Sequence, residues 1–436
     1  MGRALIVTVA LVMAWSGAAF VAQPAATEAA QSDEQLSRQV RSLVRQLSSD
    51  VAAEREAAEQ QLIALGPKVL DLLPTIDNRT PAELRLRLQR VSETLQKAAA
   101  EAAGQASTVT VKGRMPLSKA LEAIEAQTGN AIIDYRHNFQ QQAPDPELEL
   151  DLDTVPFWQA LDRVLDQAKL TIYGFPDRPG VAIVNRDNTE VARTSGAVAY
   201  AGPFRIQAVN LTSLRSLKYP GTSRLEVELE MTWEPRLRPI AISVPLLDVT
   251  ASLDDGKPLE IARLGDQGTE ITPGTYTTEI QLPFELPPRS AKSITNLESA
   301  FGVLVPGPAE SFRFTELKAG KREAQRRAKA TVTLDSLRKN NDLWEARVIL
   351  GFDEAAGALD SYRGWVFNNP CYLVDGQGQK IEPDLTETFR QTENEVGVAY
   401  YFDAPADLTG YELVYETPTV IMLLQLKYTL KNLELP

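Results

Sequence analysis

The spacing of apolar residues changes along this chain, and that change limits the folds open to it. Residues 23–133 contain no Phe, Tyr or Trp and begin with apolar residues three and four positions apart. Helix-like and strand-like spacings then alternate over residues 107–188, and from Gly202 short period-two runs are separated by proline and glycine. Helical, mixed and strand patterns in succession predict a multidomain α+β protein. The 436 residues suffice for several domains.

Residues 1–22 are predicted to be a signal peptide. Arg3 is the only early charge, and an apolar run over residues 4–15 is followed by small residues at 16–19. The run is shorter than the roughly 20 residues that cross a bilayer. Cleavage after Ala19 fits small residues at −1 and −3, whereas cleavage after Ala22 would put Phe20 at −3 and fits less well. An uncleaved anchor is the alternative. We therefore expect an exported protein of the bacterial periplasm or cell envelope, since paired cysteines are absent.

Residues 32–104 are predicted to form a helical hairpin or bundle. Ser32 and Gln35 make a capping box, Gly66-Pro67 ends a second helix, and Thr80-Pro81 starts a third. A short helix is expected over residues 68–76.

Residues 55–76 resemble one unit of a HEAT-like helical repeat. The marks are Ala57-Ala58, Leu62, Leu65-Gly66-Pro67, Leu70 and Leu73. One copy cannot bury its own apolar stripe, so the segment should close as a bundle or dock on its neighbour. A plain amphipathic helix pair fits the same residues.

Residues 107–188 are predicted to be a small α+β module of βαββαβ type. Strands are expected at 109–111, 131–135, 148–152, 171–173 and 181–184, with helices around 117–124 and 157–165. Two helices should cover one face of a small sheet. The acidic residues that alternate with leucines at 148–152 should then face water (Glu149, Asp151 and Asp153).

The stretch from about 108 to 173 resembles the short N-terminal module shared by secretins and TonB-dependent receptors. Its two Pro-Leu-x-x-Ala-Leu half-patterns match at Pro116-Leu117, Ala120-Leu121, Thr128-Gly129, Val155-Pro156, Ala160-Leu161 and Leu165. Phe157 replaces the second leucine, and Lys169-Leu170 stands where Gly-Leu is usual. The resemblance implies a periplasmic protein–protein contact domain. Nothing downstream resembles a secretin pore or an outer-membrane barrel.

Residues 200–308 and 309–436 are predicted to be two tandem antiparallel β-sandwiches. The sequences VNLTSLR at 209–215 and VTLDSLR at 332–338 agree at five of seven positions. Each precedes a long alternating strand and, later, a strand that ends in an apolar-x-x-Pro element. This shared order indicates one duplicated unit, and one sandwich of the combined size would be unusually large.

Few residues are suited to acid–base or nucleophilic chemistry. The net charge is −13, which argues against nucleic-acid binding. His137 is the only histidine and Cys371 the only cysteine, which excludes a thiolate metal cluster and leaves no Ser–His pattern. We expect no enzyme activity, cofactor or metal site, although a weak calcium site in a sandwich loop remains an alternative.

Tyr362 and Trp365 are the predicted ligand-binding residues, because a pair of exposed rings in a loop could stack on a sugar. The basic run over residues 318–329 is expected to be solvated, with contact to an anionic envelope polymer or lipid as the alternative.

The sequence therefore predicts a non-catalytic, exported envelope protein that acts as a protein–protein interaction or scaffold module. The alternative is a carbohydrate- or cell-wall-binding protein acting through the second sandwich. A hydrolase that uses a carboxylate pair is a third and less favoured hypothesis. The expected partners are envelope proteins or cell-wall polysaccharide, with no transmembrane segment after signal cleavage.

Overall fold

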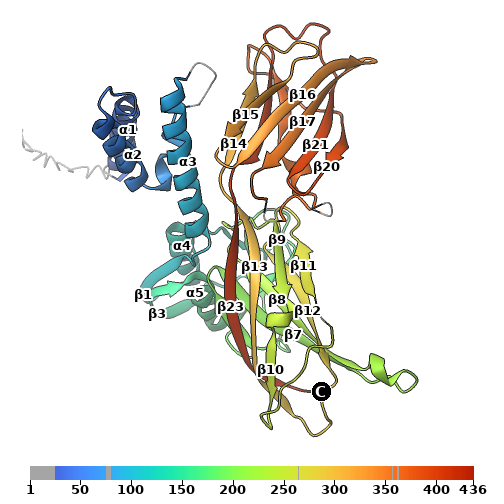
Figure 1. Cartoon of the computed structure of the whole chain (residues 1–436). Helices are drawn as coiled ribbons and strands as arrows, with labels where there is room; N and C mark the ends of the chain where they lie inside the picture. Colours follow the sequence, from blue (N-terminus) through green and yellow to red (C-terminus); the bar gives the residue numbers. More distant parts are fainter. Residues whose placement is uncertain (1–24, 75–79, 264, 356, 361–362) are drawn as a thin grey trace, which may run out of the picture. The chain divides into compact units, whose positions relative to one another are not determined.

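The computed structural model describes residues 25–74, 80–263, 265–355, 357–360 and 363–436 (Figure 1). Helices account for 22% and strands for 43% of the chain, with several antiparallel sheets, which agrees with the predicted α+β class. The predicted signal peptide, residues 1–22, lies outside the described residues. Two compact parts, Met1–Arg87 and Leu88–Pro436, meet inside a helix.

The N-terminal part is helical. It contains α1 (Ala25–Gln46), α2 (Ala52–Ala64), η1 (Pro67–Leu72) and the first turn and a half of α3 (Ala82–Ala103). The buried apolar side chains come from α1, the turn after it, α2 and η1: Val40, Leu43, Leu47, Ala58, Leu62 and Val69. The helix α1 begins before the predicted cap at Ser32, because the alanine-rich residues ahead of it have high helix propensity. The helix α2 ends ahead of Gly66, whose φ of 78° suits a glycine.

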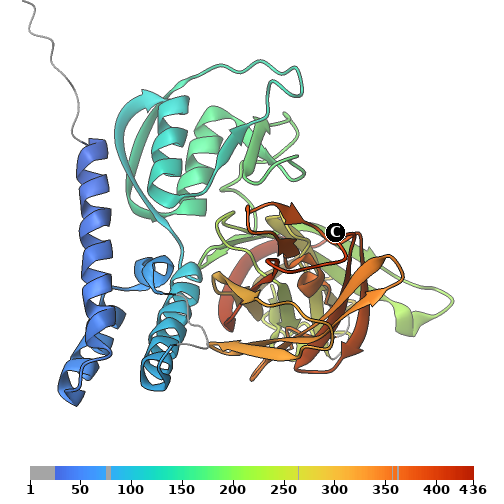
Figure 2. The same ribbon diagram turned by 90° about the horizontal axis from the view of Figure 1, so that it is seen from above.

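Residues 108–185 contain strands and helices in the predicted succession and are here called the β1–β5 module. Its elements are β1 (Thr108–Pro116), α4 (Leu117–Thr128), β2 (Ile132–Asp134), β3 (Glu147–Pro156), α5 (Phe157–Ala168), β4 (Leu170–Tyr173) and β5 (Val181–Asn185). The two helices lie side by side (Figure 2). One detail differs from the prediction: β1 pairs with β3, while β2, β5 and β4 form a separate sheet.

The next part is called the first two-sheet unit. One sheet has the order β12-β8-β7-β6 and the other the order β10-β13-β9-β11. The strands are β6 (Val198–Ala201), β7 (Phe204–Leu214), β8 (Arg224–Trp233), β9 (Ala241–Pro245), β10 (Thr250–Leu253), β11 (Asp266–Glu270), β12 (Thr277–Glu285) and β13 (Ser293–Pro306). Apolar side chains from both sheets share one core.

The second two-sheet unit is built around a second core, to which Ile240, Ala241 and Leu304 of the first unit also contribute. Its sheets have the orders β14-β22-β18-β19 and β15-β16-β17-β21-β20. The strands are β14 (Ala309–Phe314), β15 (Glu323–Arg327), β16 (Ala330–Asn340), β17 (Leu343–Phe352), β18 (Cys371–Val374), β19 (Lys380–Ile381), β20 (Leu385–Gln391), β21 (Glu395–Phe402) and β22 (Glu412–Pro418).

The last strand, β23 (Ile421–Glu434), returns to the first two-sheet unit. It pairs with β13 from Ser293↔Glu434 to Pro306↔Ile421, and its Tyr428, Leu430 and Leu433 enter the first core. The prediction that residues 309–436 form one domain is therefore wrong at its C-terminal end. The second two-sheet unit is inserted between β13 and β23.

The two units share a strand order, β12-β8-β7-β6 in one and β21-β17-β16-β15 in the other. Their central ladders also carry a bulge at the same place. Phe204 pairs with Trp233 and the register shifts after Ala208, while Ala330 pairs with Phe352 and the register shifts after Leu334. The shared bulge makes residue 209 structurally equivalent to residue 335. The seven-residue sequence match aligns residue 209 with residue 332 instead, so it does not follow the structural register.

Candidate functional site

The two predicted ligand-binding residues do not form an exposed platform among the described residues. Tyr362 lies outside those residues. Trp365 is 8% exposed, packs near Phe352 at a ring-centroid distance of 6.4 Å, and donates a hydrogen bond from Nε1 to the Ala358 carbonyl at 2.6 Å. Its indole fills the second core, because its helical turn, η4 (Trp365–Asn368), directs the ring inward.

The residues that sequence analysis considered for acid–base chemistry lie apart. His137 is exposed, and burial raises the pKa of the Cys371 thiol well above its ordinary value. Asp151 and its neighbours Glu149 and Asp153 are exposed on β3, as predicted. Within the described ranges no group of three or more His, Cys, Asp or Glu side chains is placed to hold a metal ion.

The basic run is largely consumed by intramolecular ion pairs. Its cations pair with carboxylates from several segments: Lys321 with Glu323, Arg322 with Asp335, Arg326 with Asp353, Arg327 with Glu310, and Lys329 with Glu93. This stretch is therefore a structural element of the second unit, which leaves little free positive charge for an anionic polymer.

A carboxylate pair that the sequence analysis missed lies on the outer face of the first unit. Glu279 of β12 stands opposite Glu230 of β8. Burial, followed by the neighbouring Glu228 carboxylate, raises the pKa of Glu279. Alternating glutamates in β8 were the available signal. The pair stands on a sheet face, and Glu279 is exposed.

A buried charge network joins the β1–β5 module to the first two-sheet unit. Asp162 of α5 and Arg205 of β7 are fully buried, and Arg193 is 8% exposed. Each Asp162 oxygen accepts a hydrogen bond at 2.7 Å from one guanidinium Nε, and the Tyr200 hydroxyl donates a third at 2.7 Å. Arg205 also donates to the Arg193 carbonyl at 2.9 Å. These bonds satisfy the carboxylate completely, so the network is structural.

A second set of bonds supports this junction. The fully buried Glu234 accepts hydrogen bonds from Ser107, Asn130 and Arg236. The Trp158 indole of α5 donates to the Pro203 carbonyl at 3.0 Å. The β1–β5 module is therefore fixed on one side, and a further partner must use its other faces.

An aromatic cluster with two exposed rings lies on such a face. It consists of the buried Tyr135, the half-buried Tyr173 and the exposed Phe139 and Phe175. Tyr173 is the centre, with ring centroids 6.0 Å from Tyr135, 5.0 Å from Phe139 and 6.1 Å from Phe175. Phe139 is 47% and Phe175 81% exposed. Large apolar rings held together in water are typical of protein-contact surfaces.

The sheet β2-β5-β4 positions this aromatic cluster. Ile133 pairs with Ala182, which in turn pairs with Tyr173, so these residues share the sheet face that points away from the main core of the module. The Tyr276 hydroxyl donates to the Tyr173 carbonyl at 2.6 Å and fixes the end of β4. The continuous apolar runs in β2 and β5 were the available signal, because such runs indicate strands with two apolar faces.

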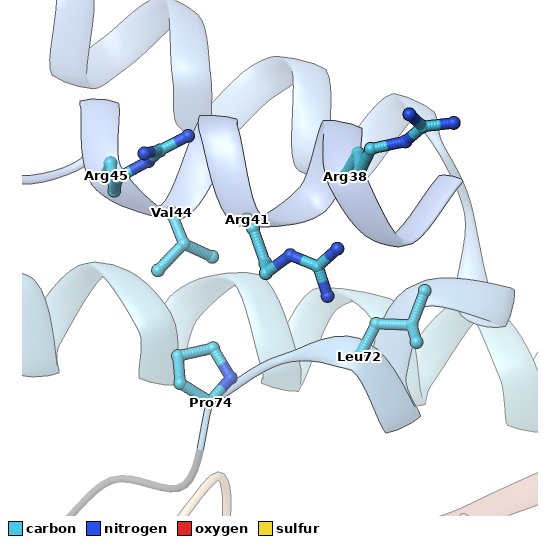
Figure 3. Close-up of a pocket in the computed structure, with 6 residues that line it drawn as sticks. All are labelled: Arg38, Arg41, Val44, Arg45, Leu72 and Pro74. Atoms are coloured by element: carbon cyan, nitrogen blue, oxygen red, sulfur yellow. The ribbon is translucent and has the colours of Figure 1, made fainter. Parts of the chain in front are cut away.

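A groove on the N-terminal helical part is a second candidate site. It has a volume of about 520 Å³ and is lined by Arg38, Arg41, Val44, Arg45, Leu72 and Pro74 (Figure 3). Arg41 and Val44 point from α1 toward Leu72 and Pro74, with the other two arginines at the sides. All three arginines are exposed, and Arg41 donates to the Ser37 hydroxyl at 2.8 Å. Within the described part of the chain, no carboxylate lies within ion-pair distance of these arginines.

Comparisons with models of protein families, with curated proteins and with solved structures gave no match. Of the helices in the described ranges, none combines the length and apolar character needed to cross a bilayer. The site assignment consequently depends on the geometry of the aromatic cluster and the arginine groove.

Proposed function

We propose that this chain is an exported, non-catalytic scaffold protein of the bacterial cell envelope, and that its β1–β5 module contacts a protein partner. The aromatic cluster carries the proposal, because it offers exposed rings on a sheet that is already anchored from the other side. The resemblance of residues 108–173 to the contact module of secretins and TonB-dependent receptors supports the same role. The two-sheet units are then duplicated β-sandwich domains, of which the first holds the module in place.

Preorganisation is the physical reason that the aromatic cluster suits this role. The Tyr135 hydroxyl accepts a hydrogen bond from the Asp177 backbone N–H at 2.9 Å, and the Tyr135 ring stacks on Tyr173. Rings that are already ordered lose little side-chain entropy when a partner covers them. Aromatic side chains also supply most of the binding free energy in many interfaces.

The carbohydrate alternative has less support, since Trp365 is buried and Tyr362 is outside the described residues. The buried Glu345 does not favour the hydrolase alternative either. Burial tends to raise the pKa of Glu345, but hydrogen bonds from Arg347 and Arg338 hold it below its usual range. A general acid needs a raised pKa.

The test replaces Phe139 and Phe175 with serine in the otherwise intact protein. Immobilised protein should capture from envelope extract one or more partners whose recovery falls at least ~10-fold in this variant, because the central rings of an interface are usually its hot spots. The control is a Leu247→Ser, Leu385→Ser variant, which removes two other exposed apolar side chains that are 71% and 52% exposed. Equal recovery by the two variants would reject the contact role of the aromatic cluster.

The arginine groove is proposed as a second contact, for an acidic segment of a partner. Its guanidinium groups suit carboxylates, and Val44, Leu72 and Pro74 offer an apolar floor for the same segment. This combination fits an amphipathic helix with one acidic and one apolar face.

Charge reversal tests this contact. The probe is a fluorescein-labelled helical peptide with one glutamate face and one leucine face. Replacing Arg38, Arg41 and Arg45 with glutamate should weaken its binding more than ~10-fold by anisotropy, because attraction becomes repulsion. A control that reverses the exposed Lys97, Lys427 and Lys431 makes the same change in net charge. Similar weakening in the control would show that net charge, and not the groove, determines peptide binding.

A further inference from the structure

A hairpin arm projects from the first two-sheet unit. The strands β7 and β8 remain paired out to Leu214↔Arg224, well beyond the part of β7 that is buried. The arm and its terminal turn stand clear of the neighbouring sheets in both views (Figures 1 and 2). Residues 214–223, here called the hairpin tip, include the short turn η2 (Pro220–Thr222).

The hairpin tip exposes large apolar side chains. Leu217 is 90%, Tyr219 59% and Leu214 44% exposed. Hydrogen bonds within the turn order its backbone, including Tyr219 N–H to the Ser216 hydroxyl and Ser216 N–H to the Ser223 hydroxyl, both 3.0 Å. The apolar side chains therefore project from a fixed turn.

The charge of the arm differs from that of the whole protein. Residues 209–225 contain Arg215, Lys218 and Arg224 and no Asp or Glu, although the chain has a net charge of −13. Arg224 pairs with Glu226 at 2.6 Å. The Lys218 ammonium lies 5.2 Å from the Tyr219 ring centroid. Arg215 and Lys218 have no carboxylate within ion-pair distance in the part of the chain that the structure describes.

We infer that the hairpin tip is a docking element for the surface of an anionic phospholipid bilayer. Leucine and tyrosine enter the boundary between headgroups and acyl chains, and the adjacent cations bind lipid phosphates. The projecting shape favours a bilayer over a protein, because a protein partner must supply a matching cavity whereas lipids rearrange around an inserted turn. The glutamates farther along β8, beginning at Glu226, are repelled by the same surface, so the arm approaches tip first.

This inference is independent of the proposed partner contact, which uses the aromatic cluster on another module. The two proposals can fail separately, because the hairpin tip and the aromatic cluster share no residue. Docking to a bilayer would also orient the first two-sheet unit, because its β7–β8 arm would point toward the lipid.

Vesicle flotation tests the inference with the protein lacking residues 1–22, so that the early apolar run cannot bind lipid. We expect binding to vesicles of phosphatidylglycerol and phosphatidylcholine, and weaker binding to phosphatidylcholine alone. A Leu217→Ser, Tyr219→Ser variant should lose at least ~10-fold in affinity, and an Arg215→Gln, Lys218→Gln variant at least ~5-fold. The Leu247→Ser, Leu385→Ser variant is the matched control and should bind as the unmodified protein does.

A fluorescent reporter locates the contact. Leu217→Cys labelled with an environment-sensitive dye should shift its emission to the blue with anionic vesicles; the native Cys371 is buried and stays unlabelled. Vesicle binding that is equal in the tip and control variants would overturn the inference. So would a dye that shifts only when an envelope protein is added to vesicle-free solution, since the hairpin tip would then contact protein.

Discussion

Replacing Asp162 with asparagine is expected to destabilise the β1–β5 module and the first two-sheet unit together, by about 3–5 kcal/mol. Asparagine keeps the size of the side chain, but it leaves the Arg193 and Arg205 guanidinium groups buried with no countercharge. Hydrogen exchange measured by mass spectrometry should show faster exchange in α5 and in β7. The strands β16 and β17 should exchange as before, since most of the core around them comes from the second two-sheet unit itself.

The control for this prediction is Asp151→Asn. Asp151 is an exposed residue of β3, so we expect a change within about 0.5 kcal/mol. A further variant replaces Asp162 with leucine and both arginines with methionine. It should recover part of the lost stability, because replacing every charge of a buried group costs less than removing one partner. If Asp162→Asn were as stable as the Asp151 control, the network would not hold the module in place.

Because of the buried charge network, deleting the β1–β5 module is a poor test of its role. Deleting residues 107–188 would expose the surface of the first unit that Trp158 covers, and it would leave the buried Arg205 unpaired. Lost partner binding after such a deletion would then report damage to the fold. Substitutions at Phe139 and Phe175 avoid this difficulty, because both side chains are exposed.

Local patterns predicted the module well because its elements depend on neighbours in sequence. The alternation at 148–152 predicted β3 with its acidic face in water, and the apolar spacings around 117–124 and 157–165 predicted α4 and α5. The Thr80-Pro81 signal likewise preceded α3. In each case one periodicity or one cap determined the element.

The candidate site was harder to predict, since its residues meet only in the folded chain. Phe139 and Phe175 follow different strands, and both rings contact Tyr173 of β4. The pattern around Trp365 resembled a polar loop, and only the position of η4 against the second core shows that the ring is buried. Asp162 is one polar residue on an otherwise apolar helix face, and its partners lie 31 and 43 positions away.

The domain boundaries failed for a related reason. The match between residues 209–215 and 332–338 indicated duplication, yet the shared bulge shows that these residues are not structurally equivalent. The two units also differ in where their outer strands come from. In the second unit the strand before β15 is β14, which pairs with β22 of the same unit. In the first unit the strand before β6 belongs to the β1–β5 module, and β13 pairs with β23 from the C-terminal end of the chain. No local pattern in residues 421–434 reveals a partner that lies more than 100 positions away.

The role of β23 leads to the prediction with the largest expected effect. A chain that ends at residue 419 should fail to fold its first two-sheet unit, while the second unit stays folded. The deletion removes Tyr428, Leu430 and Leu433 from the first core, and each large buried side chain contributes about 2–5 kcal/mol. Their sum is comparable with the whole stability of a domain, about 5–15 kcal/mol. The deletion of β23 also leaves the outer edge of β13 unpaired.

We expect rapid hydrogen exchange in β7, β8 and β13. The amides of β16 and β17 should stay protected. A synthetic peptide of residues 420–436 should restore protection when added to the shortened chain, because β23 needs to bind only along β13 and over the first core. Removing Pro436 alone is the control and should change little, since Pro436 is exposed and follows the last strand. A first unit that stayed protected without β23 would mean that it folds as an independent domain ahead of the second, as the tandem arrangement requires.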